Sequence, residues 1–190
     1  ISHPNECTKD PNRVTKEYNR EKLIQNTGVR RHEPINGGFG ISARYKDVSL
    51  RMDFAYVLGK YLINNDAYFY ANPNMEKGSN QHKSVSDFWT PYNVNAKYPD
   101  WSKGYQMQMD THLLEDASFL RLKTVVLGYS VPQRFLMKQK LFKSAMVTLT
   151  GRNLLTFTNY QGMDPEVDSN VTLGIPGNTL QVLGGIELKF

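Results

Sequence analysis

The sequence has little of several features, and each shortage argues against a class of protein. Its 190 residues include a single cysteine, Cys7, so no internal disulfide can hold the fold together. No apolar run approaches the ~18 residues that a membrane-spanning helix needs. The chain opens on Ile1 without the basic and apolar segments of a signal peptide. We therefore expect that, if the protein is exported, this chain is a fragment that lacks the N-terminal part of the protein.

The motifs of enzymes, nucleic-acid binding and zinc sites are also missing. There is no Gly-x-Ser-x-Gly, no catalytic Cys–His context and no phosphate loop, so we expect no enzyme activity. The net charge of +5 is spread over Lys and Arg residues interspersed with acids, which argues against nucleic-acid binding. The four histidines lack the spacing of a zinc site.

What the sequence does have is alternation of apolar and polar residues. In the last segment, 180–190, even positions are apolar or glycine and odd positions are mostly polar, with Leu183 as the exception. Successive side chains of a strand point to opposite faces, so this segment has one apolar and one polar face. A strand of a soluble sandwich can do the same. The same rule recurs along the chain between short and long connections, which is typical of an outer-membrane barrel.

The alternation predicts five strands, at about 38–45, 48–59, 118–131, 145–157 and 180–190. A turn at Lys46-Asp47 joins the first two strands, and apolar residues then face apolar residues throughout, which supports this register. The predicted pairs are Tyr45 with Val48, Ala43 with Leu50, Ile41 with Met52 and Phe39 with Phe54.

The connections alternate in length: segments 60–117 and 159–178 are long, whereas 46–47 and 132–144 are short. In outer-membrane barrels the long loops are extracellular and the short turns periplasmic. We therefore expect 1–36 to be an extracellular loop and 37–190 to be barrel. Arg121 and Lys123 fall among the apolar positions of the third strand. We expect these charges to lie above the bilayer.

Five strands cannot close a transmembrane barrel, which needs at least about eight. Strand edges left open in lipid expose backbone groups that cost several kcal/mol each. The predicted fold is therefore all-β, an antiparallel transmembrane β-barrel segment that forms the C-terminal piece of a larger barrel with long extracellular loops.

Two runs of sequence are specific enough to suggest a family. They are 115–132 (EDASFLRLKTVVLGYSVP) and 147–168 (VTLTGRNLLTFTNYQGMDPEVD); weaker matches are 37–40 (GGFG) and 89–99 (WTPYNVNAKYP). Together these runs resemble the C-terminal barrel of SusC/RagA-type TonB-linked outer-membrane proteins of the Bacteroidetes.

This resemblance implies a plugged barrel of about 22 strands in the cell outer membrane, which imports oligosaccharides or peptides. It further implies a SusD-like surface lipoprotein over the extracellular mouth and energy from the TonB system, received through sequence N-terminal to this chain. Gly185, Leu188 and Phe190 look like the signal that the barrel-assembly machinery reads. The resemblance implies no cofactor.

Three groups of residues are candidates for function. Aromatic residues of the 60–117 segment can contact substrate or the lipoprotein: Tyr68, Phe69, Tyr70, Trp89, Tyr92 and Trp101. Polar residues predicted to face the barrel interior can contact the plug or solute, although inward polarity is generic to barrels: Arg44, Arg51, Asp53, Arg152, Glu187 and Lys189. A weak calcium candidate is the alternating set Asp164, Glu166, Asp168 and Asn170, which lacks the Gly and Glu of an EF-hand.

Two alternatives remain at this stage. The chain can be a soluble β-rich carbohydrate-binding module, whose apolar strand faces pack in a protein core. It can also belong to another TonB-dependent receptor, such as an iron-chelate transporter. The first alternative requires apolar side chains such as Leu50, Val147 and Ile186 to converge in a dry interior, so the burial of these residues separates it from a barrel.

Overall fold

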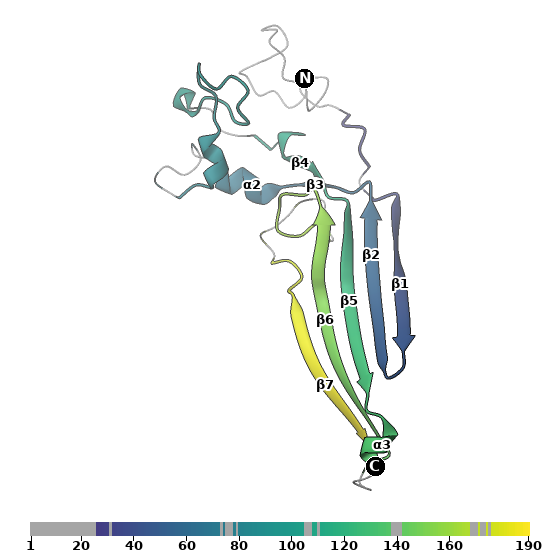
Figure 1. Cartoon of the computed structure of the whole chain (residues 1–190). Helices are drawn as coiled ribbons and strands as arrows, with labels where there is room; N and C mark the ends of the chain where they lie inside the picture. The colour runs from purple at the N-terminus through teal and green to yellow at the C-terminus, as the bar shows by residue number, and fades with distance from the viewer. Residues whose placement is uncertain are drawn as a thin grey trace.

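The computed structural model describes residues 26–30, 32–72, 74, 78, 80–104, 108–109, 111–137, 142–167, 171, 174 and 176–190. Five long strands form one sheet in the order β1-β2-β5-β6-β7, and every neighbouring pair is antiparallel. The strands are β1 Ile35–Tyr45, β2 Val48–Leu58, β5 Phe119–Ser130, β6 Ser144–Thr158 and β7 Gln181–Lys189. The sheet is long, open and curved, with β1 and β7 at its two edges (Figure 1).

The register predicted for the first hairpin is confirmed at all four pairs, from Tyr45 with Val48 to Phe39 with Phe54. The rings of Phe39 and Phe54 stack, with centroids 4.8 Å apart. The turn places Lys46 at φ 52°, a left-handed conformation in which Asn or Gly is more usual. Apolar pairing therefore fixes this register despite an unfavourable turn residue.

The largest difference in strand bounds is at the first strand, which begins at Ile35 and not at 38. Ile35 pairs with Leu58, and Asn36 pairs with Val57, so both belong to the sheet and not to the expected 1–36 loop. Residues 1–25 and 31 of that expected loop lie outside the described residues. The remaining four strands each begin and end within one residue of the predicted bounds.

A β-bulge at Lys123 gives a second explanation for the charges in β5, whereas their expected position above the bilayer stays a prediction. Thr124 pairs with Asp53, and Leu122 pairs with the next residue, Phe54, so Lys123 is an extra residue in the strand. Above the bulge the alternation of β5 is therefore shifted by one, which turns Leu122 to the apolar face and Arg121 to the polar face. Position above the bilayer is not needed to explain Arg121, because the bulge already removes it from the apolar face.

The apolar face of the sheet is exposed and does not form a dry core. Val147 is 44% exposed, Leu149 51% and Ile186 73%. A soluble sandwich module would bury these residues, and an exposed apolar face of this extent is what lipid or a partner covers. The observed face thus fits a barrel segment and does not fit the soluble alternative. Among the described residues, no helix is long and apolar enough to span a membrane.

The two kinds of connection lie at opposite ends of the sheet (Figure 1). At one end are the 46–47 turn and the connection from β5 to β6, which contains the short helix α3 (Gln133–Leu136). At the other end are the long segments that join β2 to β5 and β6 to β7. This is the arrangement predicted from the alternating connection lengths.

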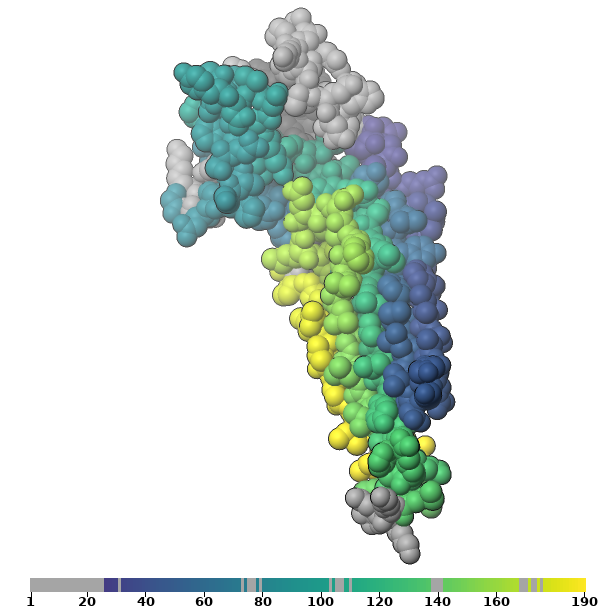
Figure 2. All heavy atoms as spheres, viewed as in Figure 1, coloured from purple at the N-terminus to yellow at the C-terminus, as the bar shows by residue number. Residues whose placement is uncertain are grey.

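The segment between β2 and β5 folds into a small unit of its own, here called the loop unit (59–118). It contains β3 (Tyr61–Ile63), α2 (Asn65–Tyr70), η2 (Lys83–Ser86), η3 (Trp101–Lys103), η4 (Thr111–Leu113) and β4 (Leu114–Asp116). Strands β3 and β4 pair as a second, two-stranded sheet. Figure 2 shows the loop unit gathered beyond one end of the long sheet.

Two small apolar clusters hold the loop unit together. One consists of Leu62, Ala117 and Tyr160, which joins the unit to the segment after β6. The other consists of Ala71, Val85 and Tyr98, with Tyr70 and Trp101 packed against it. The N-terminus of α2 is capped by the buried Asn64, whose side chain accepts a hydrogen bond from the Ala67 N–H at 3.1 Å.

Candidate functional site

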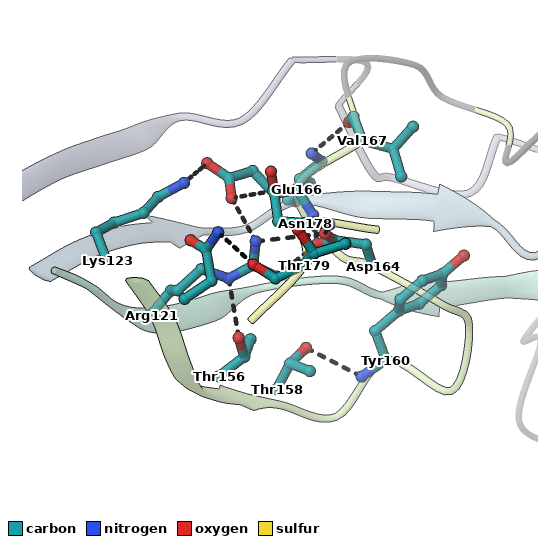
Figure 3. A network of polar contacts seen from close by, with 12 residues as sticks. Arg121, Lys123, Thr156, Thr158, Tyr160, Asp164, Glu166, Val167, Asn178 and Thr179 are labelled. Carbon is teal, nitrogen blue, oxygen red and sulfur yellow. Dashed lines mark hydrogen bonds and ion pairs between the residues drawn. The ribbon is translucent and has the colours of Figure 1, made fainter. Parts of the chain in front are cut away.

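A buried ion network lies on the polar face of the sheet, directly above the bulge (Figure 3). Arg121 of β5 donates from Nη2 to Asp164 Oδ1 at 2.5 Å and from Nη1 to Glu166 Oε2 at 2.5 Å. Lys123, the bulge residue, forms an ion pair with the other oxygen of Glu166. Arg121 and Asp164 are each only 4% exposed. The network therefore joins the sheet to the connection between β6 and β7.

Further hydrogen bonds satisfy the remaining groups of this network. Arg121 Nε donates to Thr156 Oγ1 of β6 at 2.8 Å. The carboxylate of Asp164 accepts the backbone N–H of Glu166 at 2.9 Å and that of Asn178 at 2.7 Å. The Asp164 carboxylate thus links residues 164–166 to Asn178, near the far end of the β6–β7 connection, and Arg121 attaches this carboxylate to the sheet. Burial of these charges is tolerable only because nearly all of their donors and acceptors are paired.

The Asp164 carboxyl has a pKa below its ordinary value. Burial by itself raises this pKa, since it disfavours the charged form. The hydrogen bonds from Arg121 and from the backbone of Asn178 and Glu166, together with the guanidinium charge, outweigh burial. The network is thus built for an ionised Asp164.

A close contact also requires glycine at position 177. A Cβ added to Gly177 would lie 2.7 Å from Asp164 Cβ, well inside ordinary contact distance. The neighbouring connection is tied in as well, because Lys60 Nζ donates to the carbonyl of Val167 at 2.7 Å. Both long connections therefore meet at this network.

The network gives two of the four residues of the weak calcium prediction another partner. Asp164 and Glu166 bind the guanidinium of Arg121, which takes the carboxylate oxygens that a cation would need. Asp168 and Asn170 lie outside the described residues. The described part of the chain contains no cluster of three or more His, Cys, Asp or Glu side chains that could hold a metal ion.

Sequence reasoning missed the Arg121 network, although a signal for it was present. Two charges on the apolar positions of a strand indicate either a position outside the lipid or a change of face. The carboxylates that pair with Arg121, those of Asp164 and Glu166, belong to the second run of the family resemblance, 147–168. Arg121 itself belongs to the first run, 115–132. The two runs thus contact each other through their charged residues.

The six polar residues predicted for the barrel interior share one face of the sheet, as the strand registers require. Several of them pair locally: Arg51 with Asp53 at 3.0 Å, and Lys189 with Glu187 at 3.3 Å. Arg44 Nε donates to the carbonyl of Lys46 at 3.4 Å. Arg152 lies opposite Thr124 and Gln181. These contacts are what a hydrated polar wall makes, and they assemble no reactive centre.

The six candidate aromatic residues do not form one patch. Tyr70 and Trp101 pack inside the loop unit, against the cluster of Ala71, Val85 and Tyr98. Tyr68 is half-buried and meets Phe69 edge-on at 5.3 Å. Phe69 is 53% exposed, Trp89 42% and Tyr92 100%. Of the six, only these last three are exposed large aromatic side chains.

The residues of the predicted assembly signal lie at the β7 edge of the sheet. Gly185 and Leu188 belong to β7, and Phe190 follows its last residue. Leu188 is 43% exposed and Phe190 72%, and the Phe190 ring contacts Phe142 with centroids 5.1 Å apart. The terminal segment is therefore accessible along its outer edge.

Comparison with known proteins gives one consistent family. No protein-family model matches the chain. The chain is 29% identical over 168 residues to TonB-dependent receptor P3 of Formosa agariphila and 32% identical over 152 residues to TonB-dependent receptor P26 of the same organism. It is 32% identical over 84 residues to TonB-dependent receptor SusC of Bacteroides thetaiotaomicron.

The match to these relatives covers much of the chain but little of the relatives. It spans 80% of the chain against P3 and 76% against P26, but only 16% and 14% of those two receptors. For SusC the shares are 43% of the chain and 8% of the receptor. The chain thus corresponds to a small part of each of these three receptors.

Solved structures agree with the sequence relatives. The match to the RagAB peptide importer in its closed-closed state covers 100% of this chain and 21% of the matched importer chain. Its TM-score is 0.84 and the sequence identity is 40%. The open-open state matches 93% of the chain with a TM-score of 0.79. The predicted resemblance is confirmed: the chain is an antiparallel β-barrel segment similar to part of SusC/RagA-type TonB-dependent receptors.

Proposed function

We propose that the chain is the C-terminal barrel portion of a SusC-like TonB-dependent importer in the outer membrane, which takes up oligosaccharides or peptides. The observation that carries this proposal is the match of the whole chain to the RagAB peptide importer at 40% identity. The apolar face of the sheet contacts lipid, and the polar face lines the interior. The chain itself catalyses no reaction.

The remainder of the transporter supplies what this segment lacks. Strands β1 and β7 are edges, and their backbone groups need partners in the bilayer, which neighbouring strands of a larger barrel provide. The plug and the contact with TonB lie in sequence N-terminal to this segment. The barrel-assembly machinery inserts the protein and recognises the β7 end with Phe190.

A SusD-like lipoprotein covers the extracellular mouth and contacts the loop unit. The exposed Phe69, Trp89 and Tyr92 suit this role, because aromatic residues with large accessible surface are enriched in protein interfaces. The other predicted aromatics serve the loop unit internally. Replacement of Tyr92 with Ala is expected to weaken the complex with the lipoprotein, whereas Phe135→Ala at the opposite end of the sheet is not.

The proposal is tested on the full-length parent protein in its own cell. Detergent is expected to be necessary to extract the protein from the outer-membrane fraction. Uptake of its peptide or oligosaccharide is expected to stop when TonB is deleted and to resume when TonB is restored. Recovery of the parent in the aqueous fraction without detergent, or uptake that is indifferent to TonB, would show the proposal to be wrong.

A further inference from the structure

The loop unit lines a cavity of about 310 Å³, open to solvent, that none of the preceding roles explains. It lies between α2, η2, the 97–98 segment, η4 and β4, and Gln161 from the β6–β7 connection completes its wall. Its volume is at the lower end of those of small-molecule sites. Two groups of opposite charge, Lys97 and Glu115, line the same space.

The negative group, Glu115, is held by neutral donors alone. Its Oε1 accepts from the side-chain amide of Asn64 at 3.0 Å, and its Oε2 accepts from the backbone N–H of Gln161 at 2.9 Å. Among the described residues it forms no salt bridge. An ionised carboxylate has about four acceptor sites, so Glu115 retains capacity for a cationic donor.

The positive group, Lys97, is likewise held by a neutral partner. Its ammonium donates to Gln161 Oε1 at 3.0 Å and lies over the Tyr98 ring, 5.6 Å from the centroid. No carboxylate of the described chain lies within ion-pair distance of it. Gln161 contacts both charged residues, so the fold keeps them near each other without letting them neutralise one another.

The remaining wall is rich in aromatic rings and hydrogen-bonding groups. Tyr98 is 5% exposed, and its hydroxyl lies 3.2 Å from Ser84 Oγ. The Tyr70 ring meets the His82 ring at 5.0 Å. These side chains are already positioned by packing and hydrogen bonds, so a ligand would not have to order them.

We propose that this cavity binds a short zwitterionic peptide, with the N-terminal ammonium on Glu115 and the C-terminal carboxylate on Lys97. The inference rests on the proposed import function and names the substrate class. A neutral sugar would displace water from both charges without replacing it by an opposite charge, which is unfavourable. A short peptide supplies one group of each sign and amide groups for the polar wall.

The test uses the purified full-length transporter with its surface lipoprotein and isothermal titration with trialanine, N-acetyl-trialanine, trialanine amide and maltotriose. Blocking either end is expected to weaken binding by at least about tenfold, because a charge-assisted hydrogen bond is lost. Glu115→Gln is expected to abolish the discrimination against the acetylated peptide. Lys97→Met is expected to abolish discrimination against the amide.

The matched controls are Asp66→Asn and Lys83→Met, charged residues of α2 and η2 that do not line the cavity. They are expected to leave all four affinities unchanged. Equal binding of blocked and unblocked peptides, or discrimination that survives both cavity variants, overturns the subsite. Binding of maltotriose that the cavity variants weaken also overturns it. The import function fails separately, when uptake in cells does not depend on TonB.

Discussion

Replacement of Arg121 with Met tests whether the buried ion network holds the β6–β7 connection onto the sheet. Met retains apolar length but removes the charge, so Asp164 stays buried without its cation. The side chains of Arg121 and Asp164 are 5% and 6% exposed, which makes this a buried pair. Loss of one partner of such a pair costs about 3–5 kcal/mol. Since two backbone N–H groups still donate to Asp164, we expect about 3 kcal/mol, the lower end.

We expect this loss of stability to appear as local opening of the β6–β7 connection, which amide hydrogen exchange measures directly. The backbone amides of Glu166 and Asn178 both donate to Asp164, so they report on the network. A loss of about 3 kcal/mol raises the open population, and hence their exchange rate, on the order of 100-fold. The experiment uses the full-length protein in detergent.

The matched control is Arg51→Met, which removes an arginine from an exposed pair on the same face. The side chains of this pair are 68% and 34% exposed, so water screens their attraction and its loss is expected to cost far less than the loss of Arg121. If Arg121→Met changes the exchange of these two amides by less than about tenfold, or if Arg51→Met changes it equally, the argument from burial is refuted.

Three further predictions concern pH, lipid and packing. Because the folded pKa of Asp164 lies below its unfolded value of ~4, its stabilising contribution is present above that pH and is lost as pH falls through the folded value. Amide protection at the network should therefore hold from pH 7 to 5 and decline in stronger acid; an earlier decline would contradict this sign. Leu149→Arg on the apolar face is expected to cost ~2–4 kcal/mol of folding free energy in the bilayer, and Thr150→Arg on the polar face much less. The fraction of folded barrel is measured by heat-dependent gel mobility, and equal losses in the two variants would refute the assignment of faces. Gly177→Ala is expected to loosen the network and speed amide exchange, whereas Gly184→Ala, with nothing within 4 Å of the added carbon, is expected to have no effect.

The strands could be predicted from sequence because their signal is local and repeated. Alternation has a period of two residues, and the facing of apolar residues across a two-residue turn left one register for the first hairpin. The bulge at Lys123 could not be predicted in this way, since a shift of one residue looks the same as a charge on the wrong face. Alternation within a single strand cannot distinguish a bulge from a charge on the apolar face, because only the pairing with a neighbouring strand shows the extra residue.

The short elements within the loop unit could not be predicted, for a different reason. Its short helices are too brief to show periodicity, and they are held by contacts between distant residues, such as Ala71 with Val85 and Tyr98. For the same reason, the sequence offered no way to separate the internal Tyr70 and Trp101 from the exposed Tyr92. Composition showed that the segment was rich in aromatics, but only the fold assigns them to a core or a surface.

If the apolar face of the sheet contacts lipid, as we propose, the bulge makes the charges of β5 compatible with that contact. Without it, Arg121 and Lys123 would lie among the residues of the apolar face, where a cation costs ~2–4 kcal/mol at the bilayer midplane. With it, Arg121 turns to the polar face and binds Asp164. The bulge therefore keeps Arg121 off the apolar face and also lets it hold the β6–β7 connection.

The network and the cavity share one short segment, and this predicts that they are coupled. Gln161, which contacts both Lys97 and Glu115, lies three residues before Asp164 in the β6–β7 connection. Release of Asp164 should let Gln161 move away from the cavity. Arg121→Met, which touches no cavity residue, is therefore expected to weaken trialanine binding about tenfold in the titration above, while Arg51→Met leaves it unchanged. Unchanged affinity in a variant whose network amides exchange faster would show that the cavity keeps its shape independently of the ion network.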